Sequence, residues 1–157
     1  MTLALAALLL TAQTPAAAPA KVTASIVRLF GPDARADTLR VDTVSVLRVS
    51  RADSLVGFAA IGNVLGKDQP ITFLVAIDPT DRLKDVDILV YREPYGGEVA
   101  YEPWRRQFRG KSAGDSLRVG KEIRSISGAT ISVHAVTLGV RRMLAQLSAW
   151  HQSGVIR

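Results

Sequence analysis

β-branched and aromatic residues gather in four runs along the first two thirds of the chain, each bounded by glycine, proline or acidic residues. The runs predict strands at 41–49, 54–64, 71–77 and 86–91. An Asp-Pro-Thr-Asp segment at 78–81 is a strong turn signal between the last two. Because short segments join successive runs, an antiparallel meander is favoured over alternating strands and crossover helices.

Helical periodicity flanks this predicted sheet. Residues 22–30 form a short amphipathic pattern, and residues 101–109 form another in which Trp104 and Phe108 are one turn apart. The longest pattern, at 132–150, has apolar residues at 0, +3, +7, +11 and +14. We therefore expect an α+β fold with one hydrophobic core: an antiparallel sheet meander followed by a short helix and a long C-terminal helix packed on the sheet.

The first 20 residues have the form of a secretory signal peptide, with an apolar run followed by small residues and prolines. The run is about half of the roughly 20 residues that a spanning helix requires. We expect export, to the periplasm or the outer face of the membrane; the alternative is an unstructured Ala/Pro tail. The expected divisions are a signal peptide at 1–20, an N-terminal helix and first strand at 21–52, the main domain at 53–150 and a tail at 151–157.

Composition narrows the chemistry. The 157 residues include no cysteine, which excludes disulfides, thiolate zinc sites and cysteine-ligated iron–sulfur clusters. The two histidines, His134 and His151, are too few for a histidine metal cage. No phosphate-binding loop of the Walker type and no G-x-G-x-x-G is present. No carboxylate is placed in sequence to orient His134, so we expect neither a metal site nor a catalytic triad.

The net charge of +6 is unevenly distributed. Residues 21–103 carry −2, whereas residues 104–157 carry +8, with ten Lys or Arg against two Asp or Glu. Most of the excess lies within twenty residues, in Arg105, Arg106, Arg109, Lys111, Arg118, Lys121 and Arg124. Such a run is either a solvated face or a site for an anion, such as nucleic acid, an anionic lipid or a phosphorylated ligand.

Candidate chemistry lies at the start of the long helix. There Ser127, Gly128, Ala129, Thr130 and Ser132 combine hydroxyls with small residues. The N-terminal end of a helix offers unpaired N–H groups and a positive dipole end, and small residues let a phosphate approach the backbone. The alternative is an ordinary turn in which one of the hydroxyls is the N-cap.

Two segments carry a resemblance to a known family. The Ser-Gly-Ala-Thr sequence ending at Thr130 and the Tyr-Arg-Glu-Pro-Tyr-Gly-Gly sequence at 91–97 resemble the FMN-binding domain of Rnf complex G subunits and of sodium-translocating NADH:quinone reductase C subunits. The stretch 104–111 resembles the aromatic-Gly-Lys segment that follows in that family. The resemblance covers about 54–148 and assigns 53–150 as the FMN-binding domain.

The resemblance implies that FMN is the cofactor and that its phosphate is esterified to Thr130 by a flavin transferase outside the cytoplasm. That transferase usually meets an aspartate three residues before the motif serine, where this chain has Arg124, a side chain that can pair with a phosphate. The cofactor-binding residues expected, with Glu93 to Gly96 near the flavin ring and the others near the phosphate, are Thr130, Ser127, Gly128, Ala129, Ser132, Glu93, Pro94, Tyr95, Gly96, Arg124 and Lys121.

The function expected from these features is that of an exported FMN-binding electron-transfer protein, a carrier rather than a turnover enzyme, with an unidentified redox partner for which a membrane-bound protein is a candidate. One alternative is a basic binding module without redox chemistry for an acidic partner, either nucleic acid or a lipid head group. Nucleic acid is not favoured, because few aromatic residues are interleaved with the basic ones. Another alternative is an enzyme that uses bound FMN to reduce a small substrate.

Overall fold

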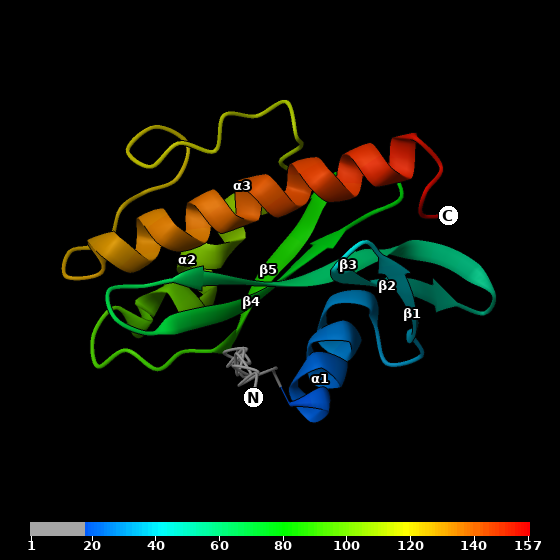
Figure 1. The fold of residues 1–157 in the computed structure, drawn as a ribbon, viewed down its shortest axis with the longest axis horizontal. Helices are drawn as coiled ribbons and strands as arrows, with labels where there is room; N and C mark the ends of the chain where they lie inside the picture. The colour runs from blue at the N-terminus through cyan, green and yellow to red at the C-terminus, as the bar shows by residue number, and fades with distance from the viewer. Residues whose placement is uncertain (1–17) are drawn as a thin grey trace, which may run out of the picture.

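The computed structural model describes residues 18–157 and contains a five-stranded antiparallel sheet (Figure 1). The strands lie in chain order, each paired with its neighbours in the sequence. They are β1 (Arg35–Val41), β2 (Val44–Arg51), β3 (Ser54–Leu65), β4 (Pro70–Ile77) and β5 (Leu83–Val90). The predicted antiparallel meander is thereby confirmed.

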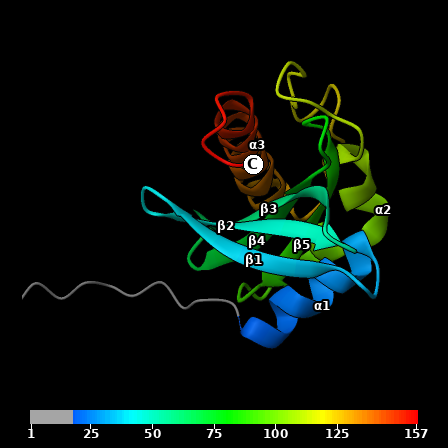
Figure 2. The same ribbon diagram turned by 90° about the vertical axis from the view of Figure 1, so that its right-hand side faces the viewer.

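Helices cover both faces of the sheet (Figure 2). Helix α3 (Thr130–Gln152) packs across β3 and β4 on one face, and α1 (Pro19–Phe30) packs on the other. After β5 come the short helical turns η1 (Gly97–Ala100), α2 (Glu102–Arg105) and η2 (Arg106–Phe108). The predicted α+β class, with a short helix and then a long C-terminal helix packed on the sheet, is confirmed.

Two hydrophobic clusters, rather than the single core expected, hold these layers together. Successive side chains of a strand point to opposite faces, so Phe58 and Phe73 belong to the cluster beneath α3. Ala59 and Leu74, their neighbours, belong to the cluster beneath α1. The expectation of one core was wrong because the central strands are buried on both faces, which their nearly continuous apolar sequence allows.

The structure also moves several element boundaries. The run expected at 41–49 is divided by a turn in which Asp42 has a φ of 51°, and β1 was missed. Strand β1 lies at the edge of the sheet and is largely exposed, so it lacks the apolar run that marks a strand. Helix α1 begins three residues earlier than expected and α3 two residues earlier. The first residues of both helices were not predicted because they lack strong apolar periodicity.

The predicted signal peptide lies, for residues 1–17, outside the described part of the chain. Within residues 18–157, no helix has both the length and the apolar character to cross a membrane. At the other end of the chain, Ile156 is fully buried in the cluster beneath α3. The Arg48 Nε donates a hydrogen bond of 2.6 Å to the Arg157 carbonyl, so residues beyond α3 contact the sheet.

Gly139 allows α3 to approach the sheet closely. A Cβ atom at this position would lie 2.6 Å from Val64 Cγ1 and 2.7 Å from Phe73 Cζ. Real side chains do not come so close, so the helix and β3 depend on the absence of a side chain there. Gly62 faces the same phenyl ring, and a Cβ on Gly62 would lie 2.8 Å from Phe73 Cζ.

The buried carboxylate of Asp85 neutralises part of the basic segment. Arg105 is 8% exposed, donates to the Val86 carbonyl at 2.6 Å and lies 3.5 Å from the Asp85 carboxylate. Arg109 donates to the same carboxylate at 3.0 Å. Asp85 is only 2% exposed and lies on β5, far from the arginines in sequence. These two cations therefore tie α2 and η2 to the sheet, and their charges are paired with Asp85 although the Arg109 side chain is 43% exposed.

Candidate functional site

The first turn of α3 presents backbone N–H groups without partners. The N-cap is Ala129, which makes no side-chain capping bond, and the first helical N–H to find an acceptor is that of Val133, 2.9 Å from the Ala129 carbonyl. Within the described residues, the N–H groups of Thr130, Ile131 and Ser132 have no acceptor. A hydroxyl N-cap, the alternative interpretation of this segment, is therefore absent, and the positive end of the helix faces outward.

A tight turn leads into this helix end. Gly128 has a φ of 80°, in the left-handed region that favours glycine, and a Cβ there would meet nothing within 4 Å. The Ala129 N–H donates back to the Ile126 carbonyl at 3.0 Å. The space beside the turn is thus open to a ligand, while the turn itself is held by its own backbone.

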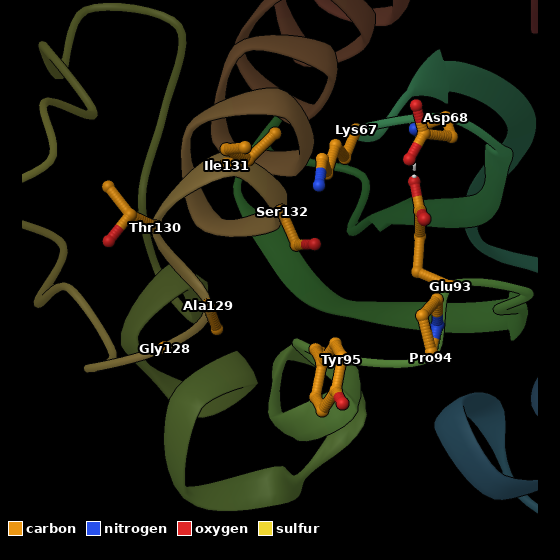
Figure 3. Close-up of a pocket in the computed structure, with 10 residues that line it drawn as sticks. All are labelled: Lys67, Asp68, Glu93, Pro94, Tyr95, Gly128, Ala129, Thr130, Ile131 and Ser132. Carbon is orange, nitrogen blue, oxygen red and sulfur yellow. Dashed lines mark hydrogen bonds between the residues drawn. The ribbon is translucent and has the colours of Figure 1, made fainter.

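A cavity of about 330 Å³ opens beside this helix end (Figure 3). Its walls come from three segments far apart in sequence: the β3–β4 loop, the segment after β5 and the start of α3. The lining residues are Lys67, Asp68, Glu93, Pro94, Tyr95, Gly128, Ala129, Thr130, Ile131 and Ser132. Tyr95 is 81% exposed and Ile131 is 52% exposed. Two large exposed apolar surfaces beside a cavity are typical of a binding site.

Tyr91 joins the segment after β5 to α3. Its phenol donates to the Tyr95 carbonyl and lies 2.7 Å from Ser132 Oγ. Because a phenol has one proton, which goes to the carbonyl, the Ser132 hydroxyl must donate to Tyr91. Ser132 then offers only lone pairs to the cavity, so its hydroxyl is not a donor to an anion there. Gly96 lies against this contact, where a Cβ would be 2.6 Å from the phenol oxygen.

Glu93 holds the β3–β4 loop in place. Its Oε1 accepts a hydrogen bond of 2.7 Å from the backbone N–H of Asp68 (Figure 3) and another of 2.9 Å from that of Gln69. These bonds, from Gln69 first and then Asp68, lower the pKa of Glu93 below its ordinary value, and the charge of Lys67 contributes in the same direction. The carboxylate therefore stays ionised and keeps Lys67 at the rim of the cavity.

Seven of the eleven residues expected to bind the cofactor line the cavity: Glu93, Pro94, Tyr95, Gly128, Ala129, Thr130 and Ser132. Gly96 lies behind the wall, against Tyr91, and Ser127 lies in the turn before Gly128. Lys121 and Arg124 are exposed and do not line the cavity. The Arg124 main chain instead binds α2 and η2, accepting from the Trp104 indole at 2.9 Å and donating to Gln107 at 2.8 Å.

Three residues that line the cavity were not predicted from the sequence: Lys67, Asp68 and Ile131. The first two belong to a Gly-Lys-Asp-Gln turn, which has the composition of an ordinary loop, and only the bonds from Glu93 connect it to the site. Ile131 lies in the first turn of α3, where the expected helix had not yet begun. Only the exposed position of this apolar residue next to the Gly-Ala-Thr turn would have indicated its place.

The cavity fits a ligand that has an anionic end and a flat apolar part. The free N–H groups of the first turn suit a phosphate, and Pro94, Tyr95, Ala129 and Ile131 supply apolar walls. FMN, the cofactor that the resemblance implies, has these two parts. No acid lies among the residues of the turn and first helical turn where the phosphate would bind.

Comparison with known proteins agrees with this geometry. The profile of the FMN-binding domain matches residues 66–145, which include the cavity segments from all three parts of the chain. The G subunit of the proton-translocating ferredoxin:NAD(+) oxidoreductase complex of Clostridium ljungdahlii is 28% identical over 108 residues. That alignment covers 64% of this chain and 58% of the relative, so the chain spans just over half of the relative's length. The chain belongs to the FMN-binding domain family, and FMN is its cofactor.

Proposed function

We propose that this protein transfers electrons through an FMN bound in the cavity at the start of α3. The observation that carries the proposal is the set of three free N–H groups at Thr130, Ile131 and Ser132, beside exposed apolar walls. FMN supplies reversible acceptance and donation of electrons when bound. The chain's own residues position it: the helix end binds the phosphate and Tyr95 and Ile131 cover the ring system.

We further propose that the phosphate is esterified to Thr130. This residue is exposed at the first position of α3, so a flavin transferase can reach its hydroxyl. The ester joins Thr130 Oγ1 to phosphorus while the hydroxyl proton is lost and a P–O bond to a leaving group on the flavin donor breaks, so the product is heavier than the chain by one FMN less one water. In this proposal Ser127, Gly128 and Ala129 lie at the phosphate end of the FMN. The side chains of Lys121 and Arg124 are exposed and available to the phosphate from outside the cavity.

The proposed cellular setting follows from the leader and from the relative. A chain exported through its first 20 residues would meet a transferase in the periplasm or at the outer face of the membrane. The relative is named as a subunit of an oxidoreductase complex, so a membrane-bound redox partner is proposed for this chain too. The domain that carries the flavin is proposed to span 53–150.

Mass spectrometry tests the ester directly. The wild type, Thr130→Val and Ser127→Ala are each produced with and without a flavin transferase, then weighed after denaturation. We expect the FMN adduct in the wild type and in Ser127→Ala, and an unmodified mass in Thr130→Val. An unmodified wild type that is yellow when native would overturn the ester and leave FMN binding intact.

Redox titration tests the carrier. The flavin-loaded protein should bleach on stepwise anaerobic reduction and recover fully when an oxidant is added. A carrier shows no sustained oxidation of a reduced nicotinamide in the absence of a partner protein. Sustained turnover would instead indicate an enzyme that uses FMN to reduce a small substrate.

A further inference from the structure

A second cavity, of about 370 Å³, lies between α3 and the loop that precedes the Ser-Gly-Ala-Thr sequence ending at Thr130. That loop runs beside the N-terminal half of α3 in Figure 1. The lining residues are Leu117, Arg118, Val119, His134, Thr137, Leu138 and Arg141. None of them lines the cavity at the start of α3 that is proposed to bind FMN, hereafter the flavin cavity, so the two are separate features of the surface.

The ionisable residues in this lining are two arginines and one histidine. They are Arg118, His134 and Arg141, and no carboxylate accompanies them. Within residues 18–157, neither arginine forms an ion pair, unlike Arg105 and Arg109. Two guanidinium groups at one cavity without an acid create a local positive potential that an anion can neutralise.

Thr137 provides a second, independent observation. It is 4% exposed, and its hydroxyl is the one fully buried side-chain polar atom within the described residues that has no hydrogen-bond partner. A buried hydroxyl without a partner costs about 1–3 kcal/mol, so native structures rarely retain one without a reason. Thr137 is one of the residues that line the basic cavity, and its unpaired hydroxyl lies beneath the surface of that wall.

The positions of these residues along α3 place the cavity on one helical face. Thr130, His134, Thr137 and Arg141 follow at 0, +4, +7 and +11, spacings that share one side of a helix. Figure 3 shows the Thr130 side chain directed to the other side of α3 from Ser132. The second cavity therefore lies along the side of α3 that faces away from Tyr91.

We propose that this cavity binds a small organic anion through a carboxylate or phosphate group. Arg118 and Arg141 are the anion donors, with the His134 ring as a further polar contact. Leu117, Val119 and Leu138 contact the carbon part of the ligand. The volume of about 370 Å³ lies within the range for ligand sites, about 300–1,000 Å³.

Titration of the flavin-loaded protein tests this site, because its flavin cavity is already filled. Inorganic phosphate and succinate are added separately at constant ionic strength, and the His134 ring resonances are followed by NMR. We expect saturable shifts with at least one probe, and the stronger probe identifies the acidic group as phosphate or carboxylate. Chloride at equal ionic strength should leave the resonances in place.

Three arginine variants separate a built site from general positive charge. Arg118→Ala and Arg141→Ala should each weaken binding about tenfold, as expected when one charge-assisted contact is lost. Arg142→Ala, which removes an exposed arginine outside the cavity lining, should change binding less than twofold. Equal weakening in all three variants, or no saturable shift with either probe, would overturn the proposal.

Discussion

Replacing Tyr91 with phenylalanine removes one hydroxyl from behind the flavin cavity. That hydroxyl donates to the Tyr95 carbonyl and accepts from Ser132 at 2.7 Å. Each hydrogen bond contributes about 1 kcal/mol net, and Ser132 is only 5% exposed, so its hydroxyl is left without a partner. We expect the free energy of unfolding to fall by about 2 kcal/mol and Tm by about 4–8 °C for a chain of this size.

The same substitution should weaken FMN binding. Tyr95 forms part of the cavity wall, and its main chain is held by the Tyr91 phenol. If about 1 kcal/mol of this contact must be restored when the ligand binds, the Kd for FMN rises about fivefold. The measurement is fluorescence titration of protein made without a flavin transferase, so that binding is reversible.

Tyr101→Phe is the matched control. Tyr101 is 64% exposed, and its hydroxyl has no hydrogen bond within the described residues. Its loss should leave Tm and the FMN Kd nearly unchanged. The role assigned to Tyr91 would be refuted if both phenylalanine variants gave the same Tm and the same Kd as the wild type.

Three further outcomes are expected. Gly139→Ala should destabilise the fold by about 1–3 kcal/mol in chemical denaturation, because the new methyl group meets Phe73, despite alanine's better helix propensity. Glu93→Gln should remove part of the acid sensitivity: the pKa of Glu93 is lowered in the fold, so its stabilising effect is present above the unfolded pKa and lost as pH falls through the folded one. Thermal scans from pH 7 to 3 should therefore converge for wild type and variant at low pH. Arg105→Met should lower the free energy of unfolding by about 3 kcal/mol, because the buried charge of Asp85 then has weaker compensation. Recovery of stability in the double variant with Asp85→Asn would support this cause.

The sequence predicted those parts of the fold in which apolar periodicity and local turn signals agree. The central strands and the long helix are of this kind, because their apolar residues are buried at regular spacing. Strand β1 was missed because an edge strand needs no apolar face. The second hydrophobic cluster was missed because nothing in a single strand's sequence states that both faces are covered.

The candidate site divides in the same way. The Gly-Ala-Thr turn was recognisable because free N–H groups at a helix start are a local property of the backbone. The place of Lys67 depends instead on the hydrogen bonds from its loop to Glu93. These bonds join segments about 25 residues apart, as the separation between Glu93 and Asp68 shows. Likewise, Asp85 neutralises Arg105 across a separation in sequence that charge counting within one segment cannot reveal.

Strand order has a consequence for the time course of folding. Every strand pairs with its neighbour along the chain, so the sheet consists of local hairpins that close small loops and form early. The flavin cavity, by contrast, needs the loop after β3, the segment after β5 and the last helix together. We therefore expect the cofactor site to be among the last parts of the molecule to form, so that a chain able to hold flavin is one that has already completed its fold.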